Sequence, residues 1–148
     1  MSEENTKEVS MLENLYKNTK MGSDSAIKIL DKADGREFKG AITEQLNGYE
    51  RFSERISNRL HELGYKEKEE GIISKMGVSI GMAMNTIMDS SDSHLAQMTV
   101  EGSTMGITDT LKILRDYENT NVSECAIKIA RDIVSFEEKN VETMKGFI

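Results

Sequence analysis

The residues best suited to chemistry fall near the middle of predicted helices. Between residues 92 and 117, a set of polar and thioether side chains recurs at steps of four, three and four, which places them on one helix face: His94, Met98, Glu101 and Met105. Glu137 lies on the apolar line of the last predicted helix. A carboxylate inside a helical bundle is costly unless it is paired, hydrogen-bonded or bound to a cation. The pattern therefore predicts a polar pocket in the interior of the protein.

Two hypotheses follow for these side chains. In the first, they form a pocket that holds an iron, manganese or zinc ion, with candidate ligands that carry carboxylate, imidazole or phenol groups: Glu101, Glu137, His94 and Tyr49. Amide side chains on the same inward lines are further polar core candidates: Gln45 and Asn140. In the second, the wide helix faces rotate so that Glu101 and Glu137 lie at the boundary with water, and no cofactor is bound. Neither hypothesis identifies a catalytic residue.

Apolar residues at three- and four-residue steps predict the helices that must position these side chains. We expect a single helical-bundle domain over 1–148, with helices at about 6–33, 36–63, 71–88, 92–117 and 122–147. The chain has no proline to interrupt them, and Gly64 is a natural helix stop. Two capping boxes are expected, Asn5 or Thr6 with Glu8 and Asn121 with Glu124.

A methionine- and glycine-rich stretch, 76–106, contains six of the ten methionines and four of the eleven glycines. It contains Asp89–Ser93, whose residues prefer helix caps, so we expect a break there rather than one continuous helix over 71–117. The weakly polar outer face of Gly71–Met88 predicts a homo-oligomer formed through that segment. The spacing of Gly102 and Gly106 predicts close helix packing.

The predicted lengths favour a crossover bundle, in which helix 92–117 runs parallel to helix 36–63. The chain resembles the ferritin-like four-helix-bundle superfamily, and in particular its functionally uncharacterised bacterial branch. The stretches that carry this resemblance are KNTKMGSDSAIKIL, MNTIMDSSDSHLAQMTVEGSTMGITD and FEEKNVETMKGFI. The resemblance covers nearly the whole chain and implies an all-α, ferritin-like fold without a known activity.

Di-iron members of that superfamily use one glutamate from each of two helices and Glu-x-x-His from each of the other two. Here the middle of the first helix has no glutamate. Asparagine replaces histidine in the pairs Glu44-x-x-Asn47 and Glu137-x-x-Asn140. Asparagine binds transition metals poorly compared with imidazole, so a standard di-iron site is not expected.

Composition argues against some classes of partner and location. A net charge of −7 argues against nucleic acid as a partner. No membrane span is expected, and the single cysteine, Cys125, fits a cytoplasmic protein. We expect a protein that is non-enzymatic or vestigial, with a role in binding or assembly. The alternative is a metal-binding protein or metal-dependent oxidoreductase with a non-standard site in the bundle centre.

Overall fold

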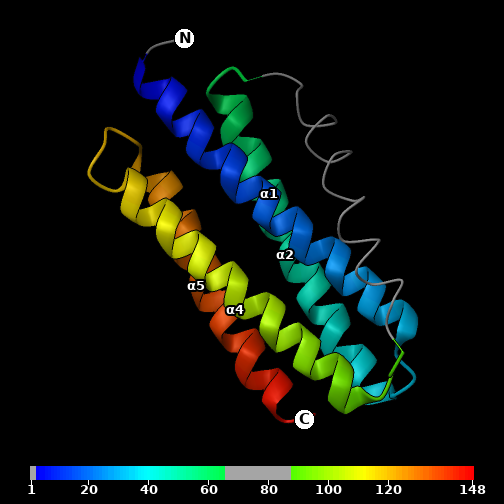
Figure 1. Cartoon of the computed structure of the whole chain (residues 1–148). Helices are drawn as coiled ribbons and strands as arrows, with labels where there is room; N and C mark the ends of the chain where they lie inside the picture. Colours follow the sequence, from blue (N-terminus) through cyan, green and yellow to red (C-terminus); the bar gives the residue numbers. More distant parts are fainter. Residues whose placement is uncertain (1–2, 66–87) are drawn as a thin grey trace.

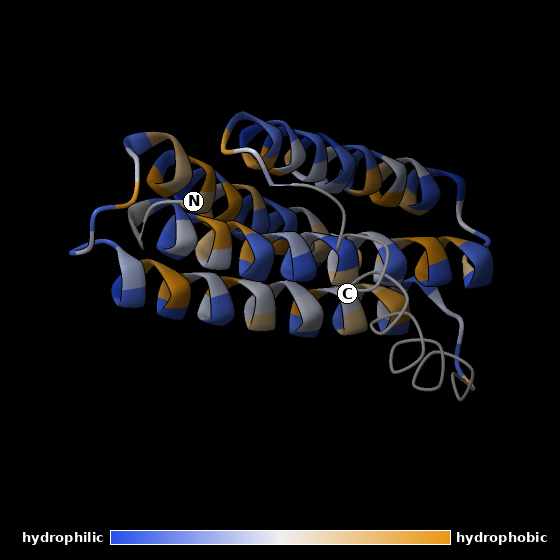
Figure 2. Ribbon diagram, turned by 90° about the horizontal axis from the view of Figure 1, so that it is seen from above, coloured by the Kyte–Doolittle hydropathy of each residue, from blue (hydrophilic) through white to orange (hydrophobic). Residues whose placement is uncertain are grey.

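The computed structural model describes residues 3–65 and 88–148, which form an all-α arrangement of long helices (Figure 1). These helices are α1 (Glu3–Lys32), α2 (Arg36–Glu62), α4 (Asp92–Tyr117) and α5 (Glu124–Lys145). Each carries hydrophobic and hydrophilic positions in alternation along its length (Figure 2). None of them is both long and apolar enough to cross a membrane.

The helices pack as a four-membered bundle in which α1 lies against α2 and α4, and α5 lies against the same two helices, closely with α4. Helices α2 and α4 run in the same direction, because α2 ends and α4 begins at opposite ends of the bundle (Figure 1). This is the relative direction expected from the sequence. The segment predicted as a helix over 71–88 lies outside the described residues except for Met88, which is exposed. The homo-oligomer predicted through Gly71–Met88 concerns the same segment and stays a prediction.

The helix ends correct several cap predictions. Helix α1 begins at Glu3, so Asn5 and Thr6 lie within the helix and do not cap it. Ser123 caps α5 by accepting a hydrogen bond from the Ala126 N–H, in place of the predicted Asn121. Gly64 has a φ of 79°, which confirms the expected stop after α2.

The predicted break before α4 is confirmed, because Met88–Ser91 are not helical. Ser91 is the N-cap of α4, and its Oγ accepts a hydrogen bond from the His94 N–H at 3.2 Å. The helix therefore begins at Asp92, where the run of cap-forming residues predicted it.

Two apolar clusters fill the ends of the bundle. The first includes Leu12, Leu15, Ile56 and Ile129, all less than about 2% exposed. The second gathers around Phe38 and includes Ile42, Leu95 and Met144. Burial of such side chains contributes roughly 1.5–3 kcal/mol each, so these clusters supply most of the stability.

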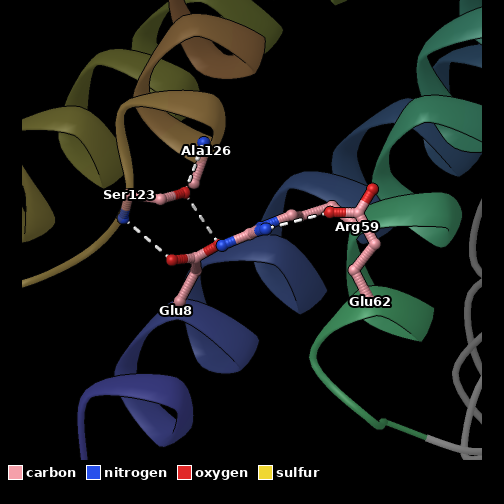
Figure 3. Close-up of polar contacts among 5 residues, drawn as sticks. All are labelled: Glu8, Arg59, Glu62, Ser123 and Ala126. Carbon is pink, nitrogen blue, oxygen red and sulfur yellow. Dashed lines mark hydrogen bonds and ion pairs between the residues drawn. The ribbon is translucent and has the colours of Figure 1, made fainter.

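A buried carboxylate, Glu8, links three helices at one end of the bundle (Figure 3). The Arg59 Nε of α2 donates to Glu8 Oε2 at 2.6 Å. The Ser123 N–H donates to Glu8 Oε1 at 2.8 Å, and the Ser123 hydroxyl donates to Glu8 Oε2 at 2.9 Å. Glu8 therefore ties α1 to the C-terminal part of α2 and to the start of α5, instead of forming the predicted capping box.

Hydrogen bonding also sets the charge of Glu8. Burial alone would raise the pKa of its carboxyl, but the hydrogen bonds from Arg59 and Ser123 outweigh burial, and the pKa lies below its usual value. Arg59 responds in the opposite direction, because its hydrogen bond with Glu8 raises the pKa of the guanidinium. The link between the helices is therefore an ion pair at neutral pH.

We predict that Glu8→Gln lowers the free energy of unfolding by about 1–3 kcal/mol at neutral pH, because it removes the charge that Arg59 and Ser123 satisfy. The matched control is Glu62→Gln, which removes the exposed partner of the same arginine and should cost less than about 1 kcal/mol. Urea denaturation measures both.

The same comparison has a defined pH dependence. Because the folded-state pKa of Glu8 is lowered, its contribution is present above the pKa of glutamate in the unfolded chain and is lost as the pH falls through the folded-state pKa. The difference between wild type and Glu8→Gln should shrink on acidification. Equal effects of the two substitutions would contradict the role of Glu8.

Candidate functional site

A layer of buried polar side chains separates the two apolar clusters. Each of its members is no more than 6% exposed, and together they come from all the described helices: Thr19, Ser23, Gln45, Tyr49, Ser53, Ser103, Glu137 and Asn140. Polar groups in a bundle interior destabilise it unless they are hydrogen-bonded. This layer is therefore the part of the core that packing alone does not explain.

A hydrogen-bonded group of three side chains forms the centre of the layer. The Tyr49 hydroxyl of α2 donates to Glu137 Oε1 of α5 at 2.5 Å. The Asn140 Nδ2, one turn further along α5, donates to the same oxygen at 3.1 Å. Both hydrogen bonds end on Oε1, so the other carboxylate oxygen, Oε2, is left for a different neighbour.

Burial controls the protonation of this group. Burial raises the pKa of Glu137, and the hydrogen bonds from Tyr49 and Asn140 counter it only in part. Burial also raises the pKa of Tyr49 well above its usual value, and the nearby Glu137 charge adds to this. Ser103 lies close enough to lower the pKa of both groups, although its hydroxyl is not placed for a hydrogen bond to either. Tyr49 therefore keeps its proton at neutral pH and donates a hydrogen bond, and Glu137 is the group of the pair that can titrate.

Glycines on the facing helices make room for this group. A Cβ at Gly22 of α1 would overlap the Tyr49 ring, and a Cβ at Gly106 of α4 would overlap Glu137 Oε2. In α2, a Cβ at Gly48 would overlap Phe136, whose ring packs edge-on against Tyr49 at 5.0 Å between centroids. The hydrogen-bonded group thus requires small residues on the helices around it.

A cavity of about 140 Å³ adjoins Glu137 and Tyr49. Its apolar wall includes Ala26, Ile29, Ile42 and Met98. Exposed residues of α1 and α4 also line it, including Met21 and Met105, which are 38% and 59% exposed. The cavity therefore reaches the surface between α1 and α4.

Buried polar atoms without a protein partner also line this cavity. Among the described residues, Asn18 Nδ2, Gln45 Nε2 and Ser103 Oγ have no hydrogen-bond partner, and each belongs to a residue of the cavity wall. Leaving such an atom unpaired costs about 1–3 kcal/mol. A guest molecule in the cavity that satisfied them would recover part of this cost.

The structure brings together part of the predicted site. Tyr49 and Asn140 both donate hydrogen bonds to Glu137, and Gln45 lines the adjoining cavity. The inward lines predicted for the second and last helices are confirmed at these positions.

The inward line predicted for α4 holds only at Met98, which is half-buried and lines the cavity. Glu101 is exposed, and His94 is half-buried in the first turn of α4, outside the cavity wall. The buried face of α4 includes Leu95, Ser103 and Thr110 instead. Where α4 passes close to Glu137, this face carries the small residues Ser103 and Gly106, which hydrophobicity does not mark.

Some residues of the site were not predicted from the sequence. They are Ser103 and Gly106 from α4 and Asn18 from α1. The predicted close packing applies to Gly106, whereas a Cβ at Gly102 would have open space around it. The available signal was the step of three and four residues that connects Leu95, Thr99, Ser103, Gly106 and Thr110.

The metal-ligand hypothesis stays a prediction. Over residues 3–65 and 88–148, no group of three or more His, Cys, Asp and Glu side chains is arranged to hold a metal ion. Of the four candidate ligands, Glu137 and Tyr49 are in direct contact with each other. Glu44, of the motif Glu44-x-x-Asn47, is exposed, as is Asn47.

No family model matches this chain, and the comparisons with curated proteins and with solved structures also gave no match. The structure places the chain in the all-α class, as a bundle of four helices over the described residues.

We predict opposite effects for two alanine substitutions in α4. Gly102→Ala should raise the free energy of unfolding by about 0.5–1 kcal/mol, because alanine favours helix and its Cβ meets open space. Gly106→Ala should lower it by about 1–3 kcal/mol, because its Cβ displaces the Glu137 carboxylate. Thermal or chemical denaturation measures both, and stabilisation by both would show that Glu137 does not pack against Gly106.

Proposed function

We propose that this protein is a ferritin-like bundle with a non-enzymatic role, and that it binds a small molecule in the cavity beside Tyr49 and Glu137. The ferritin-like assignment is supported by the parallel run of α2 and α4 (Figure 1) and by the resemblance of the sequence. The binding role is supported mainly by one observation, the grouping of unpartnered buried polar atoms around a single cavity.

Size and composition support a small organic guest. A cavity of about 150 Å³ in another protein holds benzene, and the cavity here is of about 140 Å³. Ligand sites in proteins are mostly apolar with a few convergent polar groups, and the wall here combines Ile29, Ile42 and Met98 with Gln45 and Ser103. Because Asn18, Gln45 and Ser103 come from three different helices, the guest would contact several elements at once.

We predict that the protein binds cyclopentanol, a five-membered ring with one hydroxyl that has about as many non-hydrogen atoms as benzene, with a Kd of about 1 mM, since a ligand of this size gains roughly 4 kcal/mol. Chemical-shift changes in an NMR titration measure the affinity and should centre on the residues of the cavity wall.

Ala26→Leu tests whether the cavity is the binding site, because Ala26 is buried in its wall and leucine would fill much of the space. This variant should lose binding. The matched control is Ala41→Leu, which adds the same volume to α2 outside the cavity wall and should retain it. Unchanged affinity in a folded Ala26→Leu protein would overturn the proposed site.

A further inference from the structure

The charges around the cavity are of one sign. Glu137 lines its inner part, and Asp109 of α4, which is half-buried, also lines it. None of the described residues that line the cavity is a lysine, arginine or histidine. An anionic guest would find no opposite charge there and would face two carboxyl groups, so the electrostatics favour a cation.

Glu137 has an acceptor oxygen available to such a guest. Its Oε1 already accepts hydrogen bonds from Tyr49 and Asn140. Its Oε2 lies against Gly106, which is itself part of the cavity wall. Since Tyr49 keeps its proton, the Tyr49–Glu137 group can hold a single negative charge directed toward the cavity.

The unpartnered polar atoms are two amide donors, Asn18 Nδ2 and Gln45 Nε2, and one hydroxyl, Ser103 Oγ, and a donor-rich guest is matched by the hydroxyl and by an amide that turns. An ammonium group carries three N–H donors and no acceptor. Ser103 Oγ can accept a hydrogen bond, and an amide end that turns by 180° presents its carbonyl oxygen, which applies to Gln45 and Asn18. Gln45 and Ser103 are 4% and 2% exposed, so water satisfies them poorly from outside.

We infer that the cavity binds a small primary amine of about six non-hydrogen atoms as its ammonium ion, with the charged nitrogen at Glu137 and Ser103 and the apolar body against Ile29, Ile42 and Met98. This inference rests on the proposed function, because it names the ligand class of the same cavity. It excludes carboxylates, and it ranks neutral alcohols below amines.

The test uses ligands that share one ring: cyclopentylammonium, cyclopentanol and cyclopentanecarboxylate, each titrated into the full chain by NMR at pH 8. The ammonium ion should bind about tenfold more tightly than the alcohol, which corresponds to one charge-assisted hydrogen bond. The carboxylate should not bind.

The pH gives a second measurement on the unmodified protein. A proton competes with the ammonium ion for Glu137, while the amine itself stays charged. The other titratable groups of the cavity wall are Tyr49 from α2 and Asp109 from α4, and the described cavity residues of α1 are uncharged. Affinity for the ammonium ion should fall several-fold between pH 8 and pH 5, whereas affinity for cyclopentanol should not change.

Glu137→Gln and Asp109→Asn separate the two carboxyl groups. Glu137→Gln keeps the shape of the side chain and should reduce the ammonium ion to the affinity of the alcohol, while Asp109→Asn should retain most of the preference. The inference is overturned, and the proposed function retained, if the alcohol or the carboxylate binds as tightly as the ammonium ion or if Glu137→Gln keeps the preference. Absence of binding by all the ligands would overturn both.

Discussion

The hydrogen bond between Tyr49 and Glu137 imposes the strictest constraint on this bundle. It joins α2 to α5 at 2.5 Å in the middle of the core, where an uncompensated carboxylate would be costly. The tyrosine ring needs Gly22 on α1, the carboxylate needs Gly106 on α4, and the Phe136 ring beside them needs Gly48 on α2. One polar contact therefore explains why every described helix has a small or polar residue at this level.

The ends of the bundle compensate for this polar middle. Apolar clusters around Leu12 and around Phe38 supply the burial that the central layer lacks. At one end, the Glu8 side chain forms an ion pair with Arg59 and accepts hydrogen bonds from Ser123, which links α1, α2 and the start of α5 (Figure 3). The two buried glutamates thus differ in role. Glu8 has its charge satisfied on both oxygens, whereas Glu137 keeps one oxygen beside a cavity.

Much of the fold was predictable from the sequence, because α1, α2 and α5 bury apolar residues at regular helical steps. The polar positions on their inward lines, such as Gln45, Tyr49 and Glu137, were also predictable, since they interrupt otherwise apolar faces. The part of α4 beside Glu137 was not, because it carries Ser103 and Gly106, and hydrophobicity does not distinguish serine and glycine from a solvated surface. Glu8 was misassigned for a different reason, since its partners Arg59 and Ser123 are distant in the sequence and local spacing suggested a cap.

The role of Glu137 as a buried carboxyl group held by Tyr49 is tested most directly by an NMR titration of the side-chain carboxyl carbon of Glu137 in wild type and in Tyr49→Phe. We expect a pKa above the usual glutamate value in wild type, because burial is the largest influence on it. We expect a further rise in Tyr49→Phe, because the hydrogen bond that stabilises the ionised form is lost. An ordinary pKa in wild type, or no change on removal of the tyrosine hydroxyl, would show that Tyr49 does not hold a buried Glu137 carboxyl group.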